Sequence, residues 1–179
     1  MKQQYGVDSM PETGENVAEQ YKVSLEDQAR FALRSQQKAV AAQTNGFFAE
    51  EIVPVQVLAG KKGTVTVDRD AHPRADTTLE GLAKLKPVFK KDGTVTAGNS
   101  SGRNDGAAFV LMMTAQKAKE LGYKPYAKWI MGGDYGVDPK IMGIGPAYAI
   151  PLALKRAGLK LSQMDHMECN EAFAVQNLA

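Results

Sequence analysis

The sequence GTVTAGNSSGRNDG, residues 93–106, is the stretch around which the rest of the chain is organised. It opens with the strand-like alternation of Thr94, Val95 and Thr96 and continues with glycines and small polar residues. Glycine is entropically costly inside helices and strands, and Asn and Ser side chains offer competing local hydrogen bonds. We therefore predict a loop that lets a ligand approach the backbone and presents N–H and hydroxyl donors to it. A long surface turn is the alternative, because loose glycine spacing is a weak signal.

The apolar run AAFVLMM at 107–113, directly after this loop, predicts a fully buried strand. By the same reasoning we expect further strands at 51–58, 64–68, 126–131 and 164–169. We expect helices at 12–20, 24–43, 78–85, 115–121, 147–157 and 170–178. The first two strands flank a turn at 60–63 and predict a hairpin. The second half alternates strand and helix, which implies a parallel or mixed layered sheet, whereas the first half looks like an insertion or lid.

The composition limits the classes of protein to which the chain can belong. The chain has 179 residues, 44% of them hydrophobic, which supports one or two globular domains. Its 22 basic residues are spread among 20 acidic ones, so nucleic-acid binding is not indicated. The single cysteine excludes an internal disulfide framework and fits a reducing compartment, so we expect a cytoplasmic protein. His72 and His166 show no metal-ligand spacing, and no apolar run reaches the roughly 18 residues of a membrane span.

Three motifs resemble the thiolase family when they are taken together. They are AGNSSGRNDGA at 97–107, GVDP at 136–139 with MGIGP at 142–146, and NEAF at 170–173. Segments of the first half, residues 10–18, 24–37 and 76–89, match the family as well, so the resemblance covers essentially the whole chain. Any one of these motifs alone would not be specific, but the combination is.

The resemblance implies an α/β fold of the layered thiolase type (αβαβα), incomplete in this chain, with a lid domain inserted. Residues 1–104 would form the lid or loop domain that binds CoA, 105–122 the end of the N-terminal thiolase half, and 123–179 the start of the C-terminal half. Thiolases use a nucleophilic cysteine, a second cysteine and a histidine, and the matching positions are expected outside this sequence. The resemblance therefore implies a central fragment of a thiolase that is inactive alone.

Asn170 is the catalytic residue that the resemblance implies. An Asn amide can stabilise a developing oxyanion directly or through water, although Asn is also a good helix N-cap. Glu171 would support the site rather than act as an acid or base. Ser101 would contact the pantetheine amides, Ala97 would let the pantetheine arm pass close to the backbone, and Phe173 would pack against that arm.

The remaining contacts implied by the resemblance concern the two ends of acyl-CoA. Arg74 would lie beside the adenine or its phosphates, since guanidinium groups both stack and pair with phosphate. Val88 and Phe89 would flank the adenine, and Met10 and Met142 would line the acyl end. Each of these side chains could instead be ordinary surface or core.

Two positions depart from a simple reading of the family pattern. Ser9 stands where many relatives have a histidine that contacts pantetheine, so that contact is not expected here. Cys169 precedes the NEAF motif, and we expect a buried, inert thiol at the end of an apolar strand rather than a nucleophile.

The leading functional hypothesis is acyl transfer between acyl-CoA and CoA, with coenzyme A as substrate, no further cofactor and no metal. The expected partners are the remainder of a thiolase chain or a complementary subunit, in a homodimer or homotetramer. The alternative is a non-catalytic CoA-binding module or one subunit of a split thiolase. An unrelated α/β domain is the third possibility.

Overall fold

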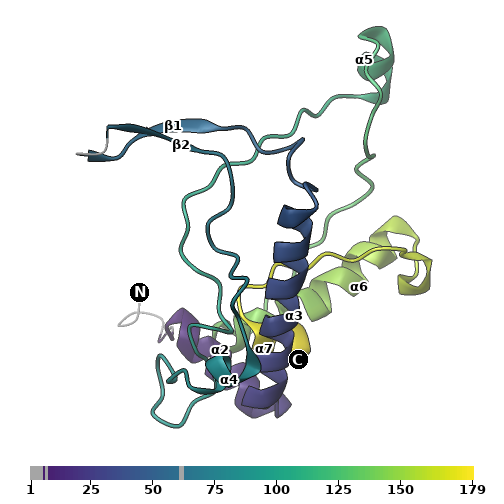
Figure 1. The fold of residues 1–179 in the computed structure, drawn as a ribbon. Helices are drawn as coiled ribbons and strands as arrows, with labels where there is room; N and C mark the ends of the chain where they lie inside the picture. The colour runs from purple at the N-terminus through teal and green to yellow at the C-terminus, as the bar shows by residue number, and fades with distance from the viewer. Residues whose placement is uncertain (1–5, 7, 61–62) are drawn as a thin grey trace.

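The computed structural model describes residues 6, 8–60 and 63–179 (Figure 1). Its helices are α2 (Met10–Tyr21), α3 (Leu25–Thr44), α4 (Leu79–Ala83), α5 (Ala115–Glu120), α6 (Gly145–Ala157) and α7 (Ala174–Leu178). Two 3-10 helices, η2 (Pro139–Ile144) and η3 (Leu161–Gln163), and two strands, β1 (Val55–Leu58) and β2 (Thr64–Val67), complete the described elements.

The core lies at one end of α3, where α2, α4 and α7 gather (Figure 1). Val17 and Ala18 of α2 pack there against Ile144 and Val175. A second cluster joins Ala29 and Ala32 of α3 to Leu82 of α4, with Leu33 beside it. Long connections reach from this base to the β1–β2 hairpin and to α5, which stand away from it (Figure 1). None of the described helices is long and apolar enough to cross a membrane.

Local capping fixes several helix starts where the sequence predicts them. Each of three hydroxyls, those of Ser24, Thr78 and Thr114, accepts a hydrogen bond from the N–H group three residues later in the chain. These bonds satisfy N–H groups that have no partner inside the helix. At the C-terminal end of α6, Gly158 adopts the left-handed conformation with φ 68°. This conformation suits glycine and ends the helix as expected.

The helix predicted at 12–20 begins earlier, at Met10, because Ser9 and Glu12 build its first turn. The Ser9 N–H donates to Glu12 Oε2 at 3.1 Å, and the Thr13 N–H donates to the Ser9 carbonyl at 3.0 Å. Pro11 fits here because a first-turn residue needs no N–H donor.

The hairpin is confirmed, with β1 and β2 antiparallel and Val55 paired with Val67. The first strand is shorter than predicted and begins only after Pro54, which has no N–H to donate to a ladder. The Ala59 N–H donates to the Gly63 carbonyl at 2.8 Å and closes the loop end. Positions 61 and 62 of the predicted turn lie outside the described residues.

The strands predicted at 107–113, 126–131 and 164–169 are wrong. Within the described residues the one sheet is the two-stranded hairpin, so the parallel or mixed sheet expected for the second half is not formed there. A strand requires a neighbour that accepts and donates its backbone hydrogen bonds. No described segment pairs with these three, and Phe109 is 95% exposed instead of buried.

Tyr21 of α2 and Tyr148 of α6 connect these two helices. The pKa of the Tyr21 phenol is raised by desolvation, by the neighbouring Tyr148 phenol and by a hydrogen bond with it. Tyr148 also stacks on Tyr135, with ring centroids 5.2 Å apart. Since the pKa of Tyr21 moves further above neutrality, its phenol stays protonated at neutral pH.

Candidate functional site

The glycine loop and the NEAF motif, some 70 residues apart in the chain, lie side by side. The Ser101 N–H donates to the Ala172 carbonyl at 2.8 Å, and the Ala174 N–H donates to the Asn99 carbonyl at 2.9 Å. Ser100 and Phe173 form an antiparallel bridge between these two bonds. Two of the three motifs that carry the family resemblance therefore form one structural unit.

Asn99 holds the loop in its turned shape. Its side chain is 5% exposed and uses both ends of the amide. Thr96 N–H donates to Asn99 Oδ1 at 2.8 Å, and Asn99 Nδ2 donates to the Thr94 carbonyl at 2.8 Å. The Ser100 hydroxyl also donates to the Thr96 carbonyl at 2.7 Å. Such side-chain bonds satisfy backbone groups that a strand would pair elsewhere, which explains the folded loop.

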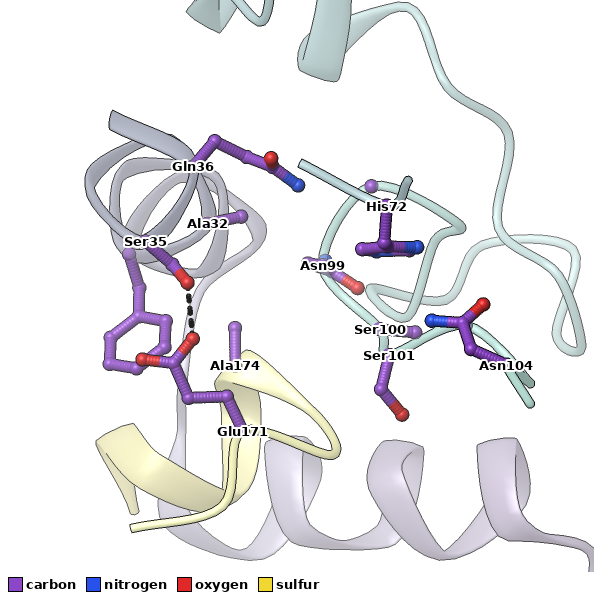
Figure 2. Close-up of a pocket in the computed structure, with 13 residues that line it drawn as sticks. Ala32, Ser35, Gln36, His72, Asn99, Ser100, Ser101, Asn104, Glu171 and Ala174 are labelled. Carbon is purple, nitrogen blue, oxygen red and sulfur yellow. Dashed lines mark hydrogen bonds between the residues drawn. The ribbon is translucent and has the colours of Figure 1, made fainter. Parts of the chain in front are cut away.

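A cavity of about 170 Å³ opens between α3, this loop and the NEAF motif (Figure 2). Much of its wall is polar, and the side chains include Ser35, Gln36, His72, Asn99, Ser101 and Glu171. In Figure 2 Ser35 of α3 points at Glu171, and its hydroxyl donates to the Glu171 carboxylate. The Arg74 N–H donates to Gln36 Oε1 at 2.8 Å, which ties the segment after His72 to α3.

Asn170 is exposed and lies in a segment without regular secondary structure before α7, not at a helix start. The helix predicted from residue 170 begins at Ala174 with Phe173 as its N-cap, so the N-cap interpretation of Asn170 is wrong. The physical reason is that Ala172 and Phe173 pair with the glycine loop, and backbone that pairs as a strand cannot also turn as a helix. Asn170 therefore precedes this paired segment with its side chain exposed.

Backbone bonds bring the predicted adenine contacts to the same loop. Pro87 bridges Thr96, and the Val88 N–H donates to the Val95 carbonyl at 2.9 Å. Val88 and Phe89 are each about half exposed, and Ala97 is exposed. These residues thus lie on segments joined to the loop that carries Ser101.

The other predicted contacts lie around this unit. Met10 begins α2, Met142 lies in η2, and both are about half exposed. The two elements are tied by Asn16 Nδ2, which donates to the Lys140 carbonyl at 2.9 Å. Arg74 lies beside the cavity through its backbone bond to Gln36 and is not among the residues that line it.

The expectation of a buried Cys169 is wrong, since this thiol is exposed. The strand that would have buried it is not formed, and its Sγ lies 3.9 Å from the Asn170 carbonyl oxygen. Sequence reasoning also missed the contributions of Glu15, Ser35 and Gln36. Their side chains sit on helix faces and contact segments distant in the chain, and no local pattern marks such contacts.

Comparison with known proteins gives the family. The family model described as thiolase, N-terminal domain, matches residues 1–116, and that described as thiolase, C-terminal domain, matches residues 123–179. The chain is 57% identical over its whole length to a Pseudomonas putida protein named beta-ketoadipyl-CoA thiolase and covers 44% of that protein. It is 54% identical over 167 residues to a Staphylococcus aureus protein named probable acetyl-CoA acyltransferase, covering 42% of it.

Solved structures agree in fold. The acetyl-CoA acetyltransferase of Bacillus anthracis superposes with a TM-score of 0.91 at 49% identity, over 94% of this chain and 43% of that one. Human mitochondrial 3-ketoacyl-CoA thiolase gives 0.84 at 47% identity, over 94% and 42%. The chain thus spans less than half the length of these relatives and has an incomplete α/β fold of the thiolase type. On this evidence the chain belongs to the thiolase family.

Proposed function

We propose that this chain supplies the CoA-binding lid and an oxyanion-stabilising motif to a thiolase that transfers acyl groups between acyl-CoA and CoA. The observation that carries the proposal is the pairing of the glycine loop with the NEAF motif through Ser101, Ala172, Asn99 and Ala174. The pairing brings the loop that we assign to the pantetheine arm next to the NEAF motif, which begins with the exposed Asn170. The relatives' names, which specify acyl-CoA and ketoacyl-CoA substrates, support the same substrate class.

The reaction would form or cleave the carbon–carbon bond of a 3-oxoacyl-CoA. In the forming direction an enolate carbon attacks a thioester carbonyl, and negative charge develops on that carbonyl oxygen. The Asn170 amide, directly or through water, would donate to the oxygen at this point. The oxyanion then collapses to the ketone as the C–S bond breaks and the thiolate leaves. Ser101 would hold the pantetheine amides, with Ala97 and Phe173 beside the arm.

The two ends of the substrate would extend away from this unit. The adenine would lie between Val88 and Phe89, which the Val88–Val95 bond holds against the loop. Arg74 would approach the phosphates or the adenine ring, and Met10 and Met142 would line the acyl end. We infer from the family resemblance that the complete enzyme is a homodimer or homotetramer, and we place it in the cytoplasm.

The test is a hybrid thiolase in which residues 1–179 replace the matching segment of the Pseudomonas putida relative. We expect its kcat for CoA-dependent cleavage of beta-ketoadipyl-CoA to stay within about tenfold of the parent enzyme. The assay follows the loss of ultraviolet absorbance of the 3-oxoacyl-CoA enolate. A hybrid of native oligomeric size that melts cooperatively but transfers no acyl group would contradict the proposal.

The second candidate is CoA binding without catalysis, or a subunit of a split thiolase. It is favoured by the contacts of the glycine loop, because the segments assigned to the pantetheine arm and to the adenine are joined within this chain. We expect the 179-residue chain alone to show no acyl transfer. Calorimetry with CoA separates the candidates: saturable binding that the double substitution Arg74→Ala and Ser101→Ala weakens supports a lid that binds alone. Absence of binding would mean that the lid requires the rest of the enzyme.

Gly98 offers a test of the close packing of the loop. A Cβ at this position would lie 2.5 Å from Leu82 Cδ2 and 2.6 Å from Leu85 Cδ1. We expect Gly98→Ala to lower the unfolding free energy of the hybrid by about 1–3 kcal/mol, since overpacking forces neighbours to shift. Gly106→Ala is the matched control, because no atom of the described residues lies within 4 Å of its Cβ position. Equal melting temperatures for the two variants would show that the loop does not pack as described.

A further inference from the structure

Glu15 lies in α2, is not among the residues that line the cavity, and only 7% of it is exposed. Its carboxylate faces the backbone at the start of the loop. The Thr94 N–H donates to both carboxylate oxygens at 2.9 Å, and the Val95 N–H donates to Oε1 at 2.8 Å. The Thr94 hydroxyl donates to Oε2 at 3.2 Å. One buried carboxylate therefore accepts every hydrogen-bond donor that Thr94 and Val95 present.

Two glycines flank this contact between α2 and the loop. A Cβ on Gly93 would lie 2.2 Å from Glu15 Oε1 and 2.7 Å from its Cδ. A Cβ on Gly14 would lie 3.1 Å from Val95 Cγ2. Gly14 and Glu15 of the helix thus lie close to the start of the loop. The absence of a side chain at Gly14 and at Gly93 permits this approach.

The glycine loop is held at both of its ends. Glu15 holds the start through Thr94 and Val95, and Ala172 holds the end by accepting the Ser101 N–H. Hydrogen bonds to a carboxylate are shorter and stronger than those between neutral groups. The segment between these anchors carries Ala97 and leads to Ser101, the two loop residues assigned above to the pantetheine arm.

We propose that Glu15 is a positioning residue for acyl-CoA: its carboxylate sets the place of the loop that binds the pantetheine arm. This inference rests on the proposed function. Glu15 acts on the substrate through the loop backbone and touches neither the thioester nor Asn170. Its contribution is to binding, because the arm contacts the loop equally in the ground state and in the transition state.

Glu15→Gln should therefore raise KM and leave kcat nearly unchanged. The glutamine side chain keeps the size of glutamate, but an NH2 group replaces one of the two carboxylate oxygens. That NH2 group faces the backbone N–H donors of the loop, so a buried donor is left without an acceptor. Loss of uniform binding raises KM without lowering kcat, and we expect a rise of about tenfold in KM and in the Kd for CoA. The segment of Asn170 retains its own supports, since Glu171 accepts from Ser35 and α7 packs against α2 and α3.

Glu19→Gln is the matched control. Glu19 lies one turn further along α2, its side chain is 77% exposed, and its one ion pair within the described residues is with Lys90 at 3.7 Å. Both substitutions remove one negative charge from the same helix, so their electrostatic effects at long range are alike. Differences between them report on the contact of Glu15 with the loop.

The experiment compares both variants in the hybrid thiolase. KM and kcat are measured by thiolysis, the Kd for CoA by calorimetry, and the exchange of the Thr94 and Val95 amide hydrogens by mass spectrometry or NMR. We expect Glu15→Gln to show the raised KM and Kd, together with faster exchange at Thr94 and Val95 than in Glu19→Gln. If Glu15→Gln does not fold, Glu15→Asp is compared with Glu19→Asp under the same criteria, because the shorter side chain withdraws the carboxylate from the loop.

Two results would overturn the inference. One is a KM and an exchange rate in Glu15→Gln equal to those of Glu19→Gln. The other is a lower melting temperature with reduced kcat and unchanged KM, which is the signature of a merely structural role. An unmutated hybrid without activity would contradict the proposed function instead, and the exchange comparison would still decide whether Glu15 holds the loop.

Discussion

Replacing Asn170 with alanine should lower the kcat of the hybrid thiolase by about 10²- to 10³-fold, with little change in KM. Removal of one preorganised oxyanion donor costs about 2.7–4 kcal/mol of transition-state stabilisation, and this loss falls on kcat when the donor acts only in the transition state. Asn170 is suited to this role because it is exposed beside a paired backbone segment. The same exposure means that the substitution should leave the fold intact.

Asn170→Asp sharpens this test, because it keeps the size of the side chain and replaces the donor by an acceptor. We expect a fall in kcat at least as large as for alanine. Asn177→Ala is the control: this amide donates to the Phe173 carbonyl at 3.3 Å within α7, so its loss affects stability slightly and kcat little. Unchanged turnover in Asn170→Ala would end the oxyanion assignment.

The 179-residue chain produced alone should associate with itself. Phe109, Val110, Leu111 and Met112 form a contiguous apolar run, and each is at least 70% exposed. Exposed apolar patches and unpaired extended backbone both favour association between chains. We expect light scattering after gel filtration to give a mass well above the 19.3 kDa of the monomer.

Substitution of Val110 and Leu111 by lysine should shift the chain toward the monomer. The control adds the same charge at exposed polar positions, Gln37→Lys with Gln116→Lys, and should leave association unchanged. A sharp monomer peak with a cooperative melt for the unsubstituted chain would contradict this prediction. It would mean that the run at 109–112 is covered by the chain itself.

Local features of the fold could be predicted from the sequence. The caps at Ser24, Thr78 and Thr114 act within three residues, and the β1–β2 hairpin closes over a short turn. The strand expected at 107–113 failed because pairing is not local: an apolar sequence has no ladder until another segment supplies one. The prediction of a helix start at residue 170 was wrong because the backbone at 172 and 173 pairs with the distant glycine loop. This pairing overrides the local preference of the sequence for a helix.

The candidate site divides in the same way. The family motifs indicated Ser101, Asn170 and Phe173 from the sequence, and the structure joins their segments. Glu15 lies in a segment that matches the family, but nothing in the sequence indicated its contact with the loop, because its partners lie 79 and 80 residues away along the chain. The wall that Ser35 and Gln36 give to the cavity likewise depends on where α3 packs, which the helical pattern alone does not determine.

The central claim is that the glycine loop and the NEAF motif together form one acyl-CoA site, and a crystal structure of the hybrid thiolase with acetyl-CoA tests it most directly. We predict electron density for the pantetheine arm between Ser101 and Phe173, with the thioester oxygen within hydrogen-bond reach of the Asn170 amide or of a water that it holds. Coenzyme density elsewhere on the enzyme, with this loop and Asn170 free of ligand, would contradict the account.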